Sequence, residues 1–269
     1  EIFPIEFYRK KPYIDIQVQL DTTGKKLTNV KMLIDSGGSD AIWLFENSKK
    51  DIITPIKHFN DILGEGLSGP IYGDRSRIPL LKMKSFEINK PTISFLDSVS
   101  TRNARNFRER NGSIGGNILK RFKVWIDYPN KRIMLKKNGS FKTGFKYNMS
   151  GIDLVYSGKE LIREKKSEIT NNDFNNGINQ NNTVDFVTSY YYQFKPTYKI
   201  ENIVKNSPAD RVGLKKGDIL VKINYKATHQ YKLEEIIQKF QEKNNKKIRL
   251  TVRRNGAIMK FEFRLEERV

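Results

Sequence analysis

Hydrophobic and polar residues alternate with a period of two along much of the first half of the chain, which is typical of strands with one buried face. The clearest example covers residues 13–20, Tyr-Ile-Asp-Ile-Gln-Val-Gln-Leu, and a more continuously apolar strand is expected over 29–34. Further strands are predicted over 85–88, 92–96, 122–127 and 132–135, with a turn at 128–131 and a short helix around 102–110. This half of the chain is therefore expected to be mostly strand.

The C-terminal part mixes strand and helix signals. The run Ser207-Pro208-Ala209-Asp210 combines a serine cap, an early proline and an acid near the positive helix end, so it predicts the start of a short helix. Apolar residues recur at helical spacing over 233–240 and predict an amphipathic helix. Strands are expected over 198–204 and 219–223, and a hairpin is expected around the two-residue turn Asn255-Gly256.

Residues 159–195 differ from both parts. The stretch 170–182 consists almost wholly of Asn, Asp, Gly and Gln, with little to bury, and predicts a mobile loop or disordered insertion. Three consecutive tyrosines, Tyr190 to Tyr192, close the stretch and are expected to return the chain to a sheet.

Composition narrows the function classes. The formal charge of +20 permits binding to nucleic acid or anionic polymers, but the basic residues are dispersed and interleaved with Glu, so we expect no nucleic-acid partner. The chain has no cysteine, and its two histidines, His58 and His229, lie far apart, so neither a metal site nor a thiolate nucleophile is expected. No apolar run approaches the ~20 residues of a membrane span.

One carboxylate, that of Asp35, lies in a sequence context typical of a catalytic residue. The apolar strand 30–34 leads directly into Asp35-Ser36-Gly37, which places an acid at the end of a rigid strand and a small, permissive turn after it. An aspartic peptidase needs this arrangement. The tripeptide alone also occurs in ordinary loops. No second Asp-Ser-Gly or Asp-Thr-Gly occurs in the chain, and Asp127 is interpreted as a strand-end or turn residue.

Two later segments strengthen the peptidase interpretation. Residues 64–73 contain four glycines and suit a mobile hairpin tip that closes over a substrate, although an ordinary surface loop is the alternative. Residues 112–119 place an apolar residue before glycine ahead of a short helix and a strand, and would pack beneath the Asp35 turn. The alternative there is simply a tight turn before a core strand.

In this order, the segments over residues 10–140 resemble the bacterial retropepsin-like aspartic peptidases, with Gly38 where that family often has alanine. The resemblance implies a mainly β fold whose first domain, residues 1–140, is a single-lobe acid protease barrel. It implies catalytic residues Asp35, Ser36 and Gly37, and a substrate-binding flap of Gly66, Leu67, Ser68 and Gly69. It further implies a homodimer, because each protomer supplies one acid of the catalytic pair.

The C-terminal part resembles a PDZ domain of the type attached to bacterial proteases. The resemblance rests on 203–209, on 212–220 and on Ile223-Asn224. It implies a PDZ domain over 141–269, β-rich with two helices, with an Asn-rich insertion at about 159–195. It also implies a peptide-binding turn of Met149, Ser150, Gly151 and Ile152, which would capture a C-terminal peptide carboxylate; the alternative is a first strand with nothing bound.

Together these features predict an aspartic endopeptidase that hydrolyses polypeptides and needs no metal or organic cofactor. The alternative is a catalytically silent dimeric scaffold that binds peptides. The first residue is Glu1 rather than Met, from which we expect a processed form that has lost an export signal or lipid anchor. With the resemblance, this predicts a periplasmic or cell-envelope location.

Overall fold

The computed structural model describes residues 1–269 except 22, 67–68, 97–98, 100, 103 and 173–182, and it leaves the side chains of 65–66, 168–172 and 183–187 undescribed. Strands make up 52% of the chain and helices 9%, so the prediction of a mainly β protein is confirmed. Among the described residues, no helix is long and apolar enough to cross a membrane.

Two large hydrophobic cores form: one consists of residues between 3 and 145, the other of residues between 147 and 269 together with Phe59. The parts of the chain around these cores are called the N-terminal and the C-terminal domain. The N-terminal elements are β1 Ile2–Pro4, β2 Glu6–Tyr8, β3 Lys11–Gln19, β4 Thr28–Ile34, β5 Ile42–Phe45, β6 Phe59–Gly66, β7 Gly69–Arg77, β8 Leu80–Met83, β9 Phe86–Asn89, β10 Thr92–Leu96, η1 Ala104–Asn106, β11 Arg110–Ile114, α1 Gly116–Leu119, β12 Phe122–Asp127 and β13 Arg132–Lys137. The C-terminal elements are β14 Ile152–Asn172, β15 Thr183–Ile203, α2 Pro208–Arg211, β16 Ile219–Ile223, β17 Lys226–Ala227, η2 Thr228–Gln230, α3 Leu233–Lys239, β18 Lys247–Arg254 and β19 Ala257–Arg264.

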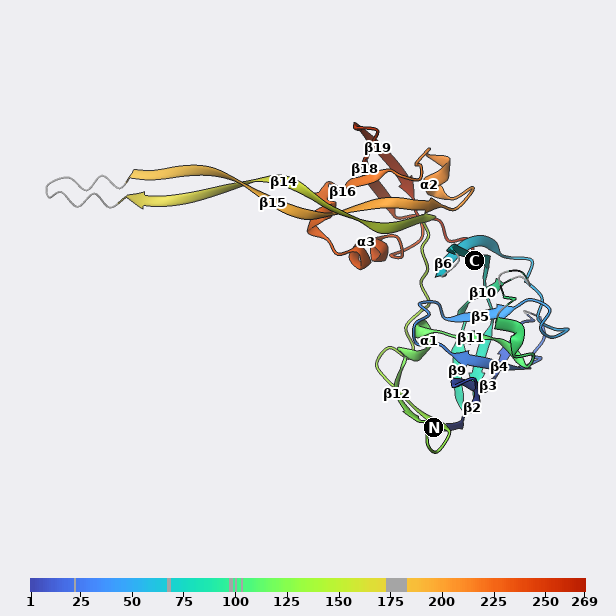
Figure 1. Ribbon diagram of the computed structural model, residues 1–269. Helices are drawn as coiled ribbons and strands as arrows, with labels where there is room; N and C mark the ends of the chain where they lie inside the picture. Colours follow the sequence, from blue (N-terminus) through green and yellow to red (C-terminus); the bar gives the residue numbers. More distant parts are fainter. Residues whose placement is uncertain (22, 67–68, 97–98, 100, 103, 173–182) are drawn as a thin grey trace.

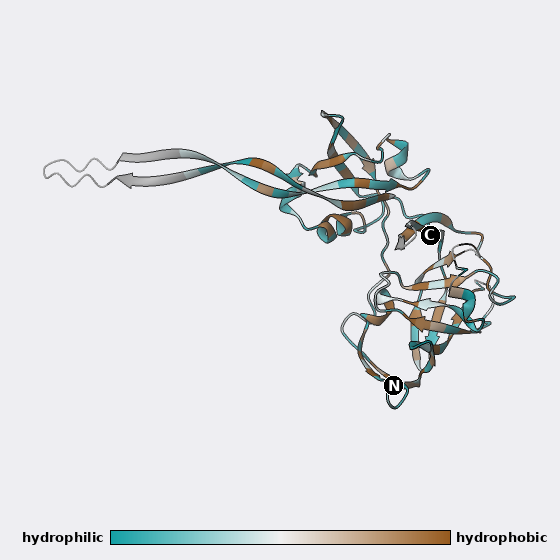
Figure 2. Ribbon diagram, in the orientation of Figure 1, coloured by the Kyte–Doolittle hydropathy of each residue, from teal (hydrophilic) through white to brown (hydrophobic). Residues whose placement is uncertain are grey.

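Over the described residues the strands form three sheets (Figure 1). A large sheet runs β6-β7-β10-β5-β11-β4-β3-β8-β9, with β2 paired to β3, and a small sheet runs β1-β13-β12. The C-terminal sheet runs β14-β15-β16-β18-β19, with β17 paired to β16. Figure 2 shows hydrophobic residues along the strands of both domains.

The centre of the large sheet has an uncommon arrangement. β11 lies between β4 and β5, parallel to β4 and antiparallel to β5, although β4 and β5 are consecutive in the chain. The backbones approach closely here, because a Cβ added at Gly112 would lie 1.9 Å from the carbonyl oxygen of Trp43. Glycine is therefore required where β11 passes β5.

The C-terminal domain carries a long arm. β14 and β15 pair antiparallel from Ile152↔Ile203 to Asn172↔Thr183 and extend away from the rest of the molecule (Figure 1). Of the loop predicted over 170–182, residues 170–172 are strand and 173–182 lie outside the described residues. Residues 170–172 form a strand despite their polar composition, because backbone pairing across the two strands holds polar residues extended without a core.

The short helix predicted around 102–110 is present only in part. Of the residues described there, Ala104–Asn106 form the 3-10 helix η1, and Arg110 already belongs to β11. No residue of η1 is buried, so no packing supports a longer helix. By contrast, the predicted caps and turns formed locally: the Ser207 hydroxyl accepts from the N–H of Asp210, and Asn255 and Gly256 both have positive φ in the β18–β19 turn.

We predict that Gly112→Ala lowers the free energy of unfolding by about 1–3 kcal/mol or more, because the new methyl group meets backbone that cannot move without breaking the β11–β5 pairing. Urea unfolding measures the effect. Gly139→Ala is the matched control, since its Cβ would meet nothing within 4 Å. Equal unfolding midpoints for the two variants would contradict the close approach.

Candidate functional site

The Asp35 turn leaves the end of β4 with its carboxylate already oriented. The Asp35 N–H donates to the carbonyl of Ile114 at 3.0 Å, which ties the turn to β11. Its Oδ1 accepts from the N–H groups of Gly37 and Gly38, both at 3.1 Å. Ser36 and Gly37 are exposed, so the turn lies at the surface, open to another molecule.

The segment after β11 packs against the Asp35 turn and forms backbone hydrogen bonds with the residues that follow it. The N–H of Gly115 donates to Ala41 O at 3.0 Å, and that of Gly116 donates to Gly38 O at 2.6 Å. A Cβ at Gly115 would lie 2.3 Å from the carbonyl oxygen of Asp40. The predicted packing of 112–119 against the Asp35 turn is therefore present, and it requires glycine at this position.

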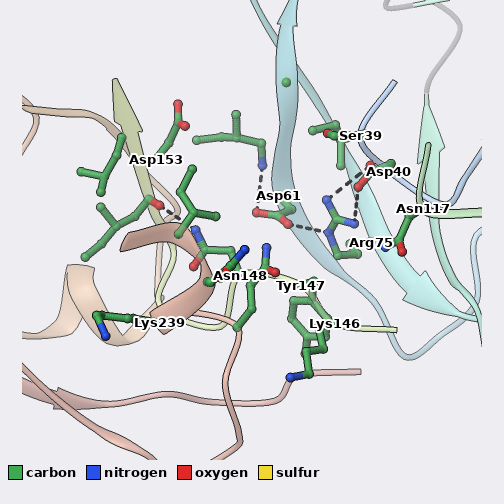
Figure 3. A pocket seen from close by; sticks show the side chains of 18 of the residues that line it. Ser39, Asp40, Asp61, Arg75, Asn117, Lys146, Tyr147, Asn148, Asp153 and Lys239 are labelled. Carbon is green, nitrogen blue, oxygen red and sulfur yellow. Dashed lines mark hydrogen bonds and ion pairs between the residues drawn. The ribbon is translucent and has the colours of Figure 1, made fainter. Parts of the chain in front are cut away.

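Arg75 of β7 joins the loop after Asp35 to the neighbouring strand (Figure 3). Its Nη1 lies 2.9 Å from Asp40 Oδ1, and its Nε lies 2.6 Å from Asp61 Oδ2 in β6. Asp40 also accepts from the indole of Trp43 at 2.7 Å, and Asp61 accepts from the N–H of Ile62 at 3.0 Å. The network connects the segment that carries Asp35 to both strands of the β6–β7 hairpin.

The two carboxylates of this network explain how the charged Arg75 guanidinium can be buried. Burial lowers the pKa of the Arg75 guanidinium, but Asp40 and Asp61 outweigh burial and raise it. Only 8% of the Arg75 side chain is exposed, so water screens the ion pairs weakly. The pairing is therefore structural: it holds the hairpin against the Asp35 loop.

The hairpin itself occupies the place predicted for a flap. β6 and β7 pair from Phe59↔Arg75 to Gly66↔Gly69 at the tip, and Gly69 has a positive φ of 112°. Of the predicted flap residues, Gly66 and Gly69 close the ladder, whereas Leu67 and Ser68 lie outside the described residues. The flap role remains a prediction.

The base of the hairpin is held by the C-terminal domain. Phe59 of β6 belongs to the C-terminal core, with its ring 5.5 Å from that of Tyr147 and the Arg268 guanidinium 3.7 Å from its centroid. Arg77 of β7 donates to the carbonyls of Phe145 and Val269 at 3.3–3.4 Å. The hairpin thus contacts both domains.

The predicted peptide-binding turn is occupied by its own chain. The N–H of Met149 donates to Phe240 O, that of Ser150 to Asn148 Oδ1, and that of Ile152 to the Ser150 hydroxyl. The Asn148 amide also donates to Ile152 O at 2.7 Å. Gly151 has φ +78° and packs against Ser207, where a Cβ would lie 2.1 Å from the Ser207 Cβ. At least three N–H groups of the turn are therefore already paired, which disfavours the predicted capture of a carboxylate.

The histidines lie apart from these residues. His58 is exposed and its Nδ1 lies 2.7 Å from Pro55 O, while His229 Nε2 lies 3.6 Å from Glu164. Within the described part of the chain, no group of three or more His, Cys, Asp or Glu residues is placed to hold a metal ion.

A PDZ domain covers residues 199–254, where the chain matches the PDZ family model. The matched range contains α2, β16, α3 and β18, together with the end of β15. It leaves out the turn at 149–152 and all of the N-terminal domain. A search of curated proteins found no match.

Among solved structures, the chain is similar to two of the HtrA-type protease AlgW with a decapeptide. One, a variant, has 10% identity and a TM-score of 0.25 over 94% of this chain and 59% of that one; the other has 11% identity and a TM-score of 0.25 over 98% and 78%. The chain thus spans less than two thirds of the first structure. At such TM-scores the likeness carries no argument about mechanism.

Local sequence patterns predicted the Asp35 turn and the segment that packs against it, but not the charged residues that hold this turn beside the β6–β7 hairpin. Asp40, Asp61 and Arg75 lie 14 to 35 positions apart, and no local pattern pairs them. The available signal was weak: Asp40 follows the Asp35 turn, and Asp61 and Arg75 lie on either side of the glycine-rich segment 64–73.

We predict that Arg75→Met lowers the free energy of unfolding by about 3–5 kcal/mol near neutral pH, because Asp40 and Asp61 lose their shared buried cation. Urea unfolding at neutral pH tests this. In the control, Arg132→Met, loss of the more exposed pair with Asp127 should lower the free energy of unfolding much less. A similar loss in both variants would contradict the structural role.

Proposed function

We propose that the N-terminal domain is one half of an aspartic peptidase. The observation that carries this is the half-buried Asp35 carboxylate, set at a strand end, oriented by two backbone N–H groups and followed by the exposed residues Ser36 and Gly37. The glycine-dependent support at Gly115 and the β6–β7 hairpin held beside the turn by Arg75 add to it. Each feature is one that peptide hydrolysis by carboxylates requires.

The proposed mechanism uses two Asp35 side chains. Two close carboxylates share one proton because both cannot readily ionise together. One takes a proton from water while the other hydrogen-bonds the scissile carbonyl. Because the chain contains a single Asp-Ser-Gly, the second acid would come from another copy across a two-fold axis. Gly37 permits the close approach, and Ser36 would anchor the two turns.

A serine nucleophile is a less suitable alternative. Such chemistry needs a histidine base within hydrogen-bond reach of the serine hydroxyl. In the part of the chain that the structure describes, His58 contacts a backbone carbonyl and His229 contacts Glu164, and no serine hydroxyl bonds either ring. The carboxylate interpretation needs no histidine.

For the C-terminal domain we propose peptide binding. The PDZ family match supports this, and β14 offers an edge strand to which an extended peptide can add. A dimeric scaffold that binds peptides without cleaving them is the second candidate, favoured by the same match. Inhibition of cleavage by a statine-type peptide separates the two.

We predict that Asp35→Asn lowers the rate of peptide cleavage by about 10²–10⁴-fold or more, because an amide cannot accept the proton from water. The far-ultraviolet circular dichroism should stay unchanged. Asp127→Asn is the control: Asp127 forms a local turn with Asn130 and Arg132, and its replacement should leave cleavage intact. Cleavage retained by pure Asp35→Asn protein would rule out the mechanism.

The dimer makes a separate prediction. Specific activity should fall on dilution, because dissociation removes one acid of the pair, and the active species should have twice the mass of the chain. Activity assays and light scattering over the same concentrations test this. Constant specific activity from a monomer would refute the two-copy site.

A further inference from the structure

A large cavity lies between the two domains (Figure 3). Its volume of about 1220 Å³ exceeds the ~300–1,000 Å³ typical of small-molecule pockets, so its size suits a segment of polypeptide. The hairpin strand β6 contributes one wall, and the start of β14 together with α3 contributes another. Asp61 and Asp153 lie on strands of these opposite walls (Figure 3).

Both walls present strand edges. β6 ends the order of the large sheet and β14 ends that of the C-terminal sheet, over the residues described. The cavity is lined by 61–64 of β6 and by 151–155, that is, Gly151 and the first residues of β14. Edge strands expose N–H and C=O groups that pair readily with another strand. The cavity is therefore bordered by two strand edges from different domains.

The two edges are held in one arrangement. Phe59, at the start of β6, is 8% exposed and packs in the C-terminal core beside Tyr147. Arg77, at the end of β7, binds backbone of the segment between the domains and of the final residues. A ligand that pairs with β14 therefore meets β6 at a set position.

The turn that begins β14 indicates which part of a polypeptide would enter. Asn148 and Ser150 already accept the N–H groups of Ser150 and Ile152, and the Asn148 amide covers Ile152 O. A terminal carboxylate would have to displace these bonds. An internal segment can instead pair with β14 beyond Ile152 without disturbing them.

Asp153 indicates the charge of that segment. Its carboxylate lines the cavity and accepts from the Asn202 amide at 3.2 Å, and the described residues provide it with no ion pair. Burial raises its pKa, and the nearby Glu201 and Asp61 raise it further. Glu201 and Asp61 already have ion-pair partners of their own. A half-buried carboxylate that lacks one favours a cationic partner.

We propose that the cavity binds an internal, extended polypeptide segment that pairs with β14 and β6 together and places a Lys or Arg side chain against Asp153. The inference rests on the peptide binding proposed for the PDZ domain, and it identifies the class of peptide. A segment bound this way lies along the hairpin whose tip is the proposed flap. Binding would thus bring the polypeptide to the side of the Asp35 turn.

The test uses the full chain carrying Asp35→Asn, so that no peptide is cut. The probe is a Thr/Val repeat of about ten residues, ~33 Å when extended, with a central Arg and both ends capped. A matched probe has Glu in place of Arg, and a third keeps Arg but has a free C-terminal carboxylate. Fluorescence anisotropy gives the affinities, and hydrogen exchange reports the paired strands.

The capped Arg probe should bind about 10-fold more tightly than the Glu probe, and Asp153→Asn should abolish this preference. A free carboxylate should add nothing, and exchange should slow in both 61–64 and 151–155. Ile62→Lys, which places a like charge on the cavity wall, should weaken binding of the Arg probe, whereas Ile56→Lys, at a fully exposed site outside the cavity lining, should not.

Three outcomes would overturn the proposal. Protection confined to β14 would remove β6 from the site. Binding that requires the free carboxylate would exclude an internal segment while leaving peptide binding by the PDZ domain in place. If none of the three probes binds, both the inference and the proposed PDZ function fail, while the peptidase proposal is judged by cleavage alone.

Discussion

The buried Arg75 guanidinium is the interaction on which the arrangement of the candidate site depends. It binds Asp40, just beyond the Asp35 turn, and Asp61, in the hairpin strand that borders the interdomain cavity. Buried ion pairs add little net stability but are costly to break, so they favour one arrangement over others. Here the favoured arrangement keeps hairpin, carboxylate turn and cavity wall in a set relation.

The same hairpin makes the two domains dependent on each other. Its strands belong to the large N-terminal sheet, yet Phe59 packs in the C-terminal core and Arg77 binds the last residues. A change in the PDZ domain would therefore reach the hairpin through packed side chains rather than through a flexible linker. This physically links the PDZ domain to the segment that carries Asp35.

Much of the candidate site could be predicted because it depends on short sequence patterns. An apolar strand followed by Asp-Ser-Gly predicts a carboxylate oriented by its own turn. The pair Ile114-Gly115 predicts a backbone that can pack closely against that turn. The position of the turn at 149–152 was also predicted from its sequence. That its backbone groups are already hydrogen-bonded was not predicted, because only the folded chain shows the Asn148 side chain bonded to Ser150 and Ile152. The long arm was missed because polar composition conceals strands that pair with each other.

The sequence by itself determined the elements whose causes lie within a few residues: alternating strands, the Ser207 cap, the Asn255-Gly256 turn and the glycine-dependent turn at Asp35. Tertiary structure decided which distant groups meet. It buried Arg75 between two acids, set β6 opposite β14 and left Asp153 in the cavity wall without an ion pair among the described residues. Local propensities act through neighbouring backbone, whereas burial and charge pairing depend on which strands the whole fold brings together.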